Sequence, residues 1–262
     1  MGASVDGAAP LLAFEGVTLA FGGVTALSDV TFDVRARELF AVIGPNGAGK
    51  TSIFNCLSGV YRPQAGTIRF EGGRIDRLSP VAIARRGVAR TFQNLALFND
   101  LTVLDNVMLG RHSRMTTGYL SAALWLGKAK REELAHRARC EEILELLELE
   151  GHRFAHVATL PYGVRKRLEL ARALAMEPKL LLLDEPVAGM NQEESEDMAR
   201  FILEIRRELG VAVLLVEHDM HLVMDLADRV LALDFGRVLR IGTPDEVRGD
   251  AAVVEAYLGV AG

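Results

Sequence analysis

One octapeptide in this chain has the glycine spacing of a phosphate-binding loop. Residues 44–51 read GPNGAGKT, which matches the pattern G-x-x-x-x-G-K-T, and they lie between an apolar run and a segment with helical character. Glycine allows successive backbone N–H groups to turn toward phosphate oxygens, and the positive end of the following helix strengthens that attraction. The pattern predicts a nucleoside triphosphate site made of Gly44, Pro45, Asn46, Gly47, Ala48, Gly49, Lys50, Thr51 and Ser52.

Two side chains of this loop have further chemistry. The Lys50 ammonium is expected to reach the β- and γ-phosphates, and the Thr51 hydroxyl is expected to ligate Mg²⁺. The alternative is a glycine-rich turn without a ligand, but such a turn would not need the strand before it and the helix after it.

Two acids follow a second apolar run. Residues 180–183 are four leucines, and Asp184 and Glu185 come directly after them. A strand this apolar is predicted to be buried, so the acids belong at its C-terminal edge, where sites form in parallel sheets. We expect Asp184 to hold Mg²⁺, directly or through water, and Glu185 to orient or deprotonate an attacking water. The alternative for such a pair is the N-cap of a helix.

A histidine follows a third apolar run. His218 comes after residues 211–216 and Glu217, and His221 lies three positions further on. Two imidazoles and one acid at this spacing do not form a zinc motif. A sensor that donates a hydrogen bond to the γ-phosphate from the same sheet edge is the better prediction for His218.

The elements that must position these residues are visible as apolar patterns. Strands are predicted over 11–34 with a break at Phe21-Gly22-Gly23, and over 39–43, 67–70, 180–183 and 211–216, with a hairpin around 230–241. Helices are predicted over 51–58, 193–209 and 220–227. From Thr102 to about Leu149 helical patterns dominate, and an amphipathic helix over 128–150 is expected to stop at Gly151. A helical block inside a strand–helix alternation predicts two lobes.

Composition excludes several classes of protein. The 262 residues carry a formal net charge of −5, which argues against a nucleic-acid binder. The two cysteines, Cys56 and Cys140, are too few for a disulfide framework and are expected to be buried thiols in a reducing compartment. The longest apolar runs are far shorter than the ~20 residues of a spanning helix. The first ten residues have no secretory pattern and are expected to form a flexible tail.

In order and spacing, these motifs resemble the ATP-binding subunits of ABC transporters over nearly the whole chain. The resemblance implies an α/β fold: a P-loop NTPase (RecA-like) core with an antiparallel β subdomain and an inserted α-helical subdomain. It implies that residues 11–93 and 165–249 form the core with its β subdomain and that residues 94–164 form the helical signature subdomain. Residues 1–10 would be a flexible tail and residues 250–262 a C-terminal helix or tail.

The resemblance also assigns roles. Phe21 matches the aromatic residue that stacks on adenine, and Gln93 matches the glutamine that senses Mg²⁺ and the attacking water, with a place among the metal ligands beside Thr51 and Asp184. Asp184 and Glu185 match the Walker B strand, and His218 matches the switch histidine. These matches imply Glu185, His218 and Gln93 as catalytic residues, with ATP and Mg²⁺ as cofactors.

Residues 160–164, LPYGV, occupy the place of the signature motif LSGGQ. In this family the signature helix points its N-terminus at the γ-phosphate held by a second subunit, so Tyr162 and Gly163 are expected to contact a partner's nucleotide in a head-to-tail dimer. Three departures are present: Pro161 replaces the serine, Val164 the glutamine, and Asn191 the aspartate of the D-loop. The Tyr162 hydroxyl is one candidate substitute for the lost serine, and the backbone alone is the other.

The segments GPNGAGKTS, GVARTFQNLALF, LPYG, DEPVAGMN, VEHDM and VVEAYLG are similar to the first ATPase subunit of branched-chain amino acid uptake systems. This similarity implies a motor on the cytoplasmic side of the inner membrane, attached peripherally. Its partners would be a second ATPase subunit, identical or related, two transmembrane permease subunits, and a periplasmic or extracellular substrate-binding protein, without nucleic acid.

Alternatives to this function remain at the level of sequence. Urea, short amides or other small solutes are alternative cargoes, because membrane and binding subunits choose the cargo. A soluble ABC ATPase acting on DNA or ribosomes is a second class, although such proteins usually have tandem cassettes or long coiled-coil insertions. For the apolar stripe over 119–125, core packing is favoured over docking to a membrane subunit.

Overall fold

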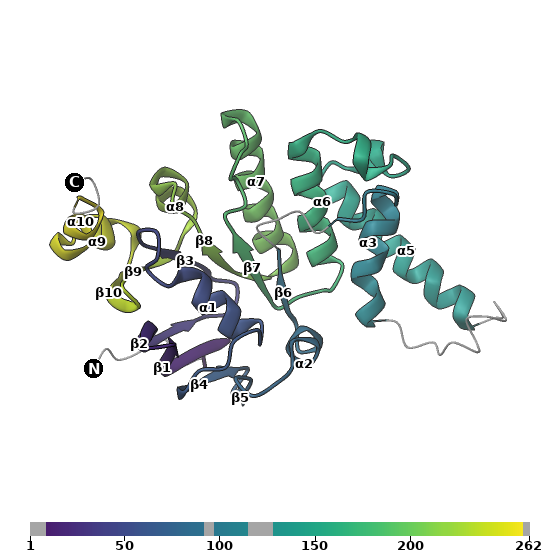
Figure 1. Cartoon of the computed structure of the whole chain (residues 1–262). Coiled ribbons are helices and arrows are strands. Elements are labelled where there is room, and N and C mark those ends of the chain that lie inside the picture. Colours follow the sequence, from purple (N-terminus) through teal and green to yellow (C-terminus); the bar gives the residue numbers. More distant parts are fainter. Residues whose placement is uncertain (1–8, 92–96, 115–127, 259–262) are drawn as a thin grey trace.

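A computed structural model of the chain describes residues 9–91, 97–114 and 128–258, and its centre is a six-stranded sheet (Figure 1). Its strands are β3 (Leu39–Ile43), β6 (Val88–Arg90), β7 (Leu180–Asp184), β8 (Ala212–Val216), β9 (Arg229–Asp234) and β10 (Arg237–Gly242). They are ordered β10-β9-β3-β8-β7-β6, and all neighbours are parallel except the hairpin of β9 and β10. The carboxyl ends of β3, β7, β8 and β9 therefore meet along one edge.

A second, antiparallel sheet covers part of the first. Its order is β2-β1-β4-β5. The strands are β1 (Leu12–Phe21), β2 (Val24–Val34), β4 (Ala65–Phe70) and β5 (Gly73–Arg74). The predicted break at Phe21-Gly22-Gly23 is the turn between β1 and β2, with both glycines at positive φ. The predicted antiparallel β subdomain is thus present.

Side chains of β3 alternate between two separate cores. Leu39, Ala41 and Ile43 enter one core, whereas Phe40 and Val42 enter the other, as the period of two in a strand requires. The first core contains side chains of α7 (Gln192–Leu209) and α8 (Met220–Leu226). The second contains α1 (Lys50–Leu57) and the antiparallel sheet. Helices α7 and α8 therefore cover one face of the central sheet, and α1 with the antiparallel sheet covers the other (Figure 1).

The predicted helical block follows the short strand β6 and helix α2 (Pro80–Arg85). It contains α3 (Val103–Arg111), the 3₁₀ turn η1 (His112–Arg114) and α5 (Lys128–Leu146). The 3₁₀ turns η2 (Glu150–His152) and η3 (Val157–Thr159) and helix α6 (Tyr162–Leu174) follow it. The buried Arg111 guanidinium joins these helices, because it donates to the Ala175 carbonyl at 3.0 Å and to His136 Nδ1 at 3.0 Å.

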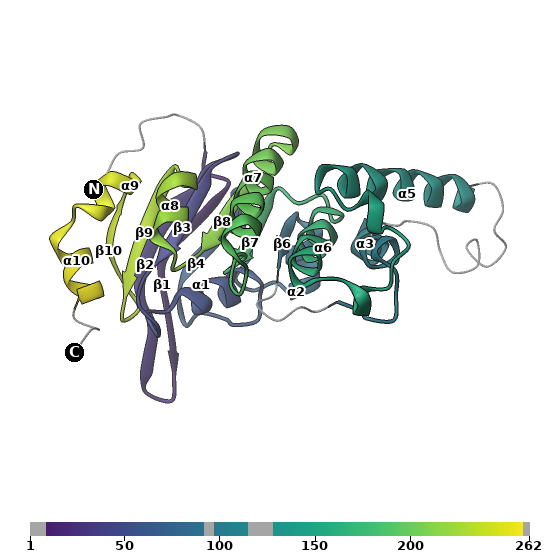
Figure 2. The same ribbon diagram turned by 90° about the horizontal axis from the view of Figure 1, so that it is seen from above.

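Helix α6 connects the two lobes without a break. It begins at Tyr162 and continues to Leu174, so the expected domain boundary between residues 164 and 165 falls inside its first turn. Figure 2 shows α6 beside β6 and the central sheet, with α3 and α5 further out. The side chains of Val164 and Leu168 belong to the same core as β7.

The C-terminal part packs onto the central sheet. Helices α9 (Pro244–Arg248) and α10 (Ala251–Leu258) follow β10, and Val247 and Val253 are buried in the first core. Both cysteines are buried and unpaired, as expected. Within the described residues, no helix combines the length and apolar character needed to cross a bilayer.

The prediction that the long amphipathic helix reaches Glu150 and stops at Gly151 is wrong. Helix α5 ends at Leu146, and Glu148 has a left-handed φ of 53°. Leu147 and Leu149, on either side of Glu148, are both fully buried. The apolar spacing continues past the helix end because this turn returns the chain to the same core.

Replacing Glu148 by glycine is expected to raise the free energy of unfolding by about 0.5–1 kcal/mol, because glycine adopts positive φ without Cβ strain. The ion pair of Glu148 with Arg200 at 3.0 Å is exposed on both sides and contributes little. Glu145→Gly, inside the helix, is the control and should lower stability by a similar amount. Urea denaturation of both variants tests this, and equal losses would contradict it.

Candidate nucleotide-binding site

The predicted phosphate loop joins β3 to α1. Backbone atoms of neighbouring strands occupy the space that a side chain would need at two of its glycines. A Cβ on Gly44 would lie 2.2 Å from the Leu233 carbonyl oxygen of β9, and a Cβ on Gly49 would lie 2.6 Å from the Ala26 carbonyl oxygen of β2. Gly49 also has φ 109°. The turn after β9 is fixed to the loop as well, because Gly236 N–H donates to the Ala48 carbonyl at 2.8 Å. At Gly44 and Gly49, packing against these neighbouring strands therefore requires glycine, independently of any phosphate that the loop binds.

Lys50 is the first residue of α1, and its ammonium folds back over the loop. It donates to the carbonyl oxygens of Gly44 at 2.6 Å and Pro45 at 3.0 Å. Burial lowers the pKa of Lys50, and the charges of Glu185 and Asp184 oppose that shift. The two acids at the end of β7 are thus close enough to act electrostatically on this ammonium.

A cavity of about 430 Å³ opens above the loop. It brings together most of the predicted loop residues and Glu185 with residues from β2 and the β9–β10 turn. Its lining consists of Val24, Thr25, Ala26, Asn46, Gly47, Ala48, Gly49, Lys50, Thr51, Ser52, Glu185 and Phe235. Asn46, Gly47 and Ala48 also line a second cavity of about 460 Å³.

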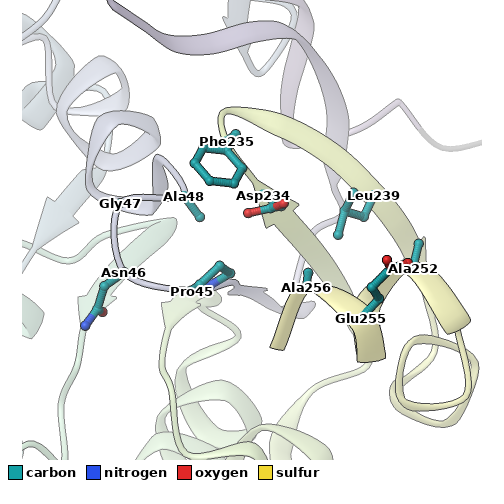
Figure 3. Close-up of a pocket in the computed structure, with 10 residues that line it drawn as sticks. All are labelled: Pro45, Asn46, Gly47, Ala48, Asp234, Phe235, Leu239, Ala252, Glu255 and Ala256. Carbon is teal, nitrogen blue, oxygen red and sulfur yellow. The ribbon is translucent and has the colours of Figure 1, made fainter. Parts of the chain in front are cut away.

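That second cavity lies between the loop and the C-terminal part, and Figure 3 shows Phe235 near Ala48 at its border, with Glu255 and Ala256 on the α10 side. Phe235 lines both cavities and is 83% exposed. Sequence reasoning missed this residue. The available signal was an aromatic residue beside the glycine of a predicted hairpin turn.

Phe21, the expected adenine-stacking residue, is at the turn between β1 and β2. Its ring is 46% exposed and lies edge-on to Tyr61 at a centroid distance of 4.9 Å. Phe21 is not among the described residues that line the 430 Å³ cavity, whereas Val24, three residues later, is. The stacking role of Phe21 therefore remains a prediction.

The acids lie at the end of β7, as predicted. Asp184 is 4% exposed and its Oδ2 accepts a hydrogen bond from Arg90 Nη2 at 2.8 Å. Glu185 leaves the strand with a left-handed φ of 48°, and its N–H donates to the Val216 carbonyl of β8 at 2.9 Å. Arg90 was not singled out from the sequence, although it precedes the expected site residue Gln93. Gln93 itself lies outside the described residues.

His218 follows β8 and faces two carboxylates. Its Nδ1 lies 3.9 Å from Glu185 Oε1 and 3.8 Å from Glu217 Oε2. The Glu217 carboxylate is fully buried and accepts the N–H groups of Val187 at 3.4 Å, His218 at 3.0 Å and Asp219 at 3.4 Å. Glu217 thus connects the loop after the two acids to the loop of His218, a contact that sequence reasoning missed.

Burial raises the pKa of Glu217, and the three N–H donors and His218 partly offset this shift. A folded-state pKa above the unfolded value removes stability as the pH rises above the ordinary carboxyl range.

The signature segment packs on its own chain. The Tyr162 hydroxyl donates to the Ala188 carbonyl at 2.9 Å, in the loop before α7. A Cβ on Gly163 would lie 2.4 Å from Glu194 Oε1, so glycine makes room for the first turn of α7. Asn191, at the D-loop position, caps α7 by accepting the Glu194 N–H at 2.9 Å.

Other side chains of α6 also face inward. Val164 is 8% exposed and packs in the first core. The Arg167 guanidinium donates to the Leu147 carbonyl at 3.3 Å and lies over the Phe201 ring of α7, so its charge is directed at the junction of the helical lobe with α7. Among the described residues, no member of 160–164 lines the 430 Å³ cavity of the same chain.

Glu217→Gln is expected to flatten the pH dependence of stability. The wild type should lose free energy of unfolding relative to the variant as the pH rises above the ordinary carboxyl range, because only the wild type must ionise a buried carboxyl. Urea denaturation at several pH values measures this difference, and parallel curves for the two proteins would contradict it.

Comparison with known proteins agrees with this geometry. Residues 27–188 match the family model "ABC transporter", and residues 241–262 match the model "Branched-chain amino acid ATP-binding cassette transporter". The chain is 41% identical over 252 residues to the high-affinity branched-chain amino acid transport ATP-binding protein LivG of Salmonella typhimurium, with 96% of this chain and 99% of LivG covered. It is 40% identical over 255 residues to BraF of Pseudomonas aeruginosa, at the same coverages.

Among solved structures, the ADP conformation of an ATP-binding cassette of an ABC transporter superimposes with a TM-score of 0.84 at 28% identity. This match covers 96% of our chain and 100% of that one. A nucleotide-free ATP-binding cassette superimposes with a TM-score of 0.82 at 28% identity, covering 95% and 99%. Fold, loop, acids and sequence identity over almost the whole length agree, and the chain belongs to the ABC transporter family as an ATP-binding cassette.

Proposed function

We propose that this chain is the ATP-hydrolysing subunit of an importer for branched-chain amino acids. The observation that carries the proposal is near full-length similarity to LivG and BraF, together with the separate match of residues 241–262 to a branched-chain amino acid cassette model. The cassette would work with a second ATPase subunit, two permease subunits and a substrate-binding protein. It would be attached peripherally to the cytoplasmic side of the inner membrane.

The residues at the cavity fit a magnesium nucleotide. Thr51 lines the cavity, and the buried carboxylate of Asp184 lies at the end of β7 near Lys50. A hydroxyl and a carboxylate are oxygen ligands of the kind that Mg²⁺ prefers, and Gln93 would add an amide oxygen. When bound, the ion would neutralise charge on the β- and γ-phosphate oxygens.

The protein groups divide the remaining work. Lys50 and the loop N–H groups would bind phosphate oxygens. Glu185 lines the cavity and would accept a proton from the attacking water, while His218, 3.9 Å from Glu185 Oε1, would donate to the γ-phosphate. Glu217 would fix the positions of these two residues relative to each other, because its carboxylate accepts backbone N–H groups from both of their loops.

Dimerisation is supported by where the signature helix lies. In Figures 1 and 2, α6 is on the far side of β7 and β6 from α1, so its N-terminus does not meet the cavity of its own chain. A second chain in head-to-tail orientation would supply Tyr162 and Gly163 to that cavity. The Tyr162 hydroxyl already bonds Ala188, which favours the helix backbone as the contact to phosphate.

Glu185→Gln is expected to bind ATP, to lower turnover by at least about 100-fold because the general base is lost, and to accumulate an ATP-bound dimer. Equilibrium nucleotide binding, phosphate release and size-exclusion chromatography measure the three effects. Lys50→Ala is the control and should lose ATP binding and therefore the dimer. Full turnover in Glu185→Gln would show that another residue activates the water.

Uptake in the source cell tests the cargo. Deletion of the gene should lower uptake of radiolabelled leucine and valine, and the wild-type gene, but not the Lys50→Ala variant, should restore it. Unchanged leucine and valine uptake in the deletion strain, with loss of urea or amide uptake instead, would contradict the proposed cargo while leaving the ATPase assignment intact.

A further inference from the structure

Arg90 ends β6 and lies between the acid-bearing strand β7 and helix α1. Its Nη2 donates to Asp184 Oδ2 at 2.8 Å, while its Nη1 donates to Asn55 Oδ1 at 2.8 Å and to Ser58 Oγ at 3.1 Å. The guanidinium carbon lies 5.4 Å from the centroid of the Phe54 ring. One planar side chain thus bridges the end of β7 to a helix from another part of the fold.

We infer that Arg90 is a positioning residue of the magnesium site, which holds the Asp184 carboxylate in a fixed place relative to helix α1. This inference rests on the proposed ATPase function, since it assigns a role to Asp184 in binding the metal. Arg90 itself is not expected to touch the nucleotide.

The bridge connects the two predicted metal ligands. Helix α1 begins at Lys50, so Thr51 and Asn55 are one turn apart on the same short helix. Asp184 is held against that helix through Arg90 alone among the hydrogen bonds that the described residues show to its side chain. Among the described residues, this guanidinium is therefore the polar link between the Asp184 carboxylate and the helix that carries Thr51.

Burial and the planar arrangement of its N–H donors make this contact selective for arginine. The Arg90 and Asp184 side chains are 12% and 4% exposed, so water cannot replace either partner easily. A guanidinium has several N–H donors in one plane, and Arg90 uses two of its nitrogens for three oxygen acceptors on two elements. A lysine ammonium keeps the charge but lacks the planar fork, so it cannot reproduce the same bridge.

The decisive variant is Arg90→Lys, because it keeps a positive charge beside Asp184 and changes only the geometry. We expect the Mg²⁺ concentration that gives half-maximal ATPase activity to rise about 10-fold, the usual cost of losing a group that orients a metal ligand. Nucleotide binding measured in EDTA should stay unchanged. Asn55→Ala removes one anchor on α1 and should shift the Mg²⁺ dependence in the same direction by a smaller factor.

Arg229→Lys is the matched control. Arg229 is also a partly buried arginine, which pairs with Asp33 at 3.3 Å and Glu38 at 3.1 Å and lies 5.2 Å from the Phe40 ring. It is at the opposite end of the strands, because it begins β9. Arg229→Lys should lower the melting temperature without changing the Mg²⁺ concentration at half-maximal ATPase activity. It therefore measures the effect of weakening an ion pair that has only a structural role.

Asp184→Asn, measured alongside, separates the possible failures. A changed Mg²⁺ dependence in Asp184→Asn with none in Arg90→Lys and Asn55→Ala would overturn the role of Arg90 and leave the magnesium site in place. An unchanged dependence in all three variants would overturn the magnesium assignment of Asp184 together with the inference. If Arg90→Lys does not fold, Asn55→Ala alone decides between these outcomes.

Discussion

The exclusion of charge from the buried parallel sheet is the constraint on which the site depends. Strands β3, β7 and β8 are buried along their whole length, so ionisable groups are tolerated only where the strands end. Because these strands are parallel neighbours, their ends meet at one edge. Lys50, Asp184, Glu185 and His218 come from distant parts of the chain and are brought together there.

Neighbouring strands of the same chain fix the shape of the phosphate loop. Carbonyl groups of β9 and β2 occupy the space that side chains on Gly44 and Gly49 would need. The hairpin of β9 and β10 is also attached to the loop, because the Gly236 N–H donates to the Ala48 carbonyl. Phe235, in the turn of the same hairpin, lines the 430 Å³ cavity, so this hairpin contributes to the shape of that cavity.

Two buried carboxylates at the sheet edge are handled in different ways. Asp184 is neutralised by an arginine from β6, whereas Glu217 is stabilised by backbone N–H groups and the nearby His218. The signature segment also has partners in its own chain. The Tyr162 hydroxyl donates to the Ala188 carbonyl, and Gly163 leaves room for the Glu194 side chain. The N-terminus of α6 and the start of α7 therefore form one packed unit.

Local patterns in the sequence were enough to predict most strands, the helical block and the phosphate loop. They succeed because alternation and helical spacing report burial within a single element, and because GPNGAGKT specifies one local backbone shape. They could not find the contact of Arg90 with Asp184, which lie 94 positions apart, or the exposed Phe235 beside Ala48. They also placed the end of α5 wrongly, because Leu147 and Leu149, on either side of the turn at Glu148, continue the buried helical spacing past the helix end. Such features follow from which elements pack together, and only the tertiary structure decides that.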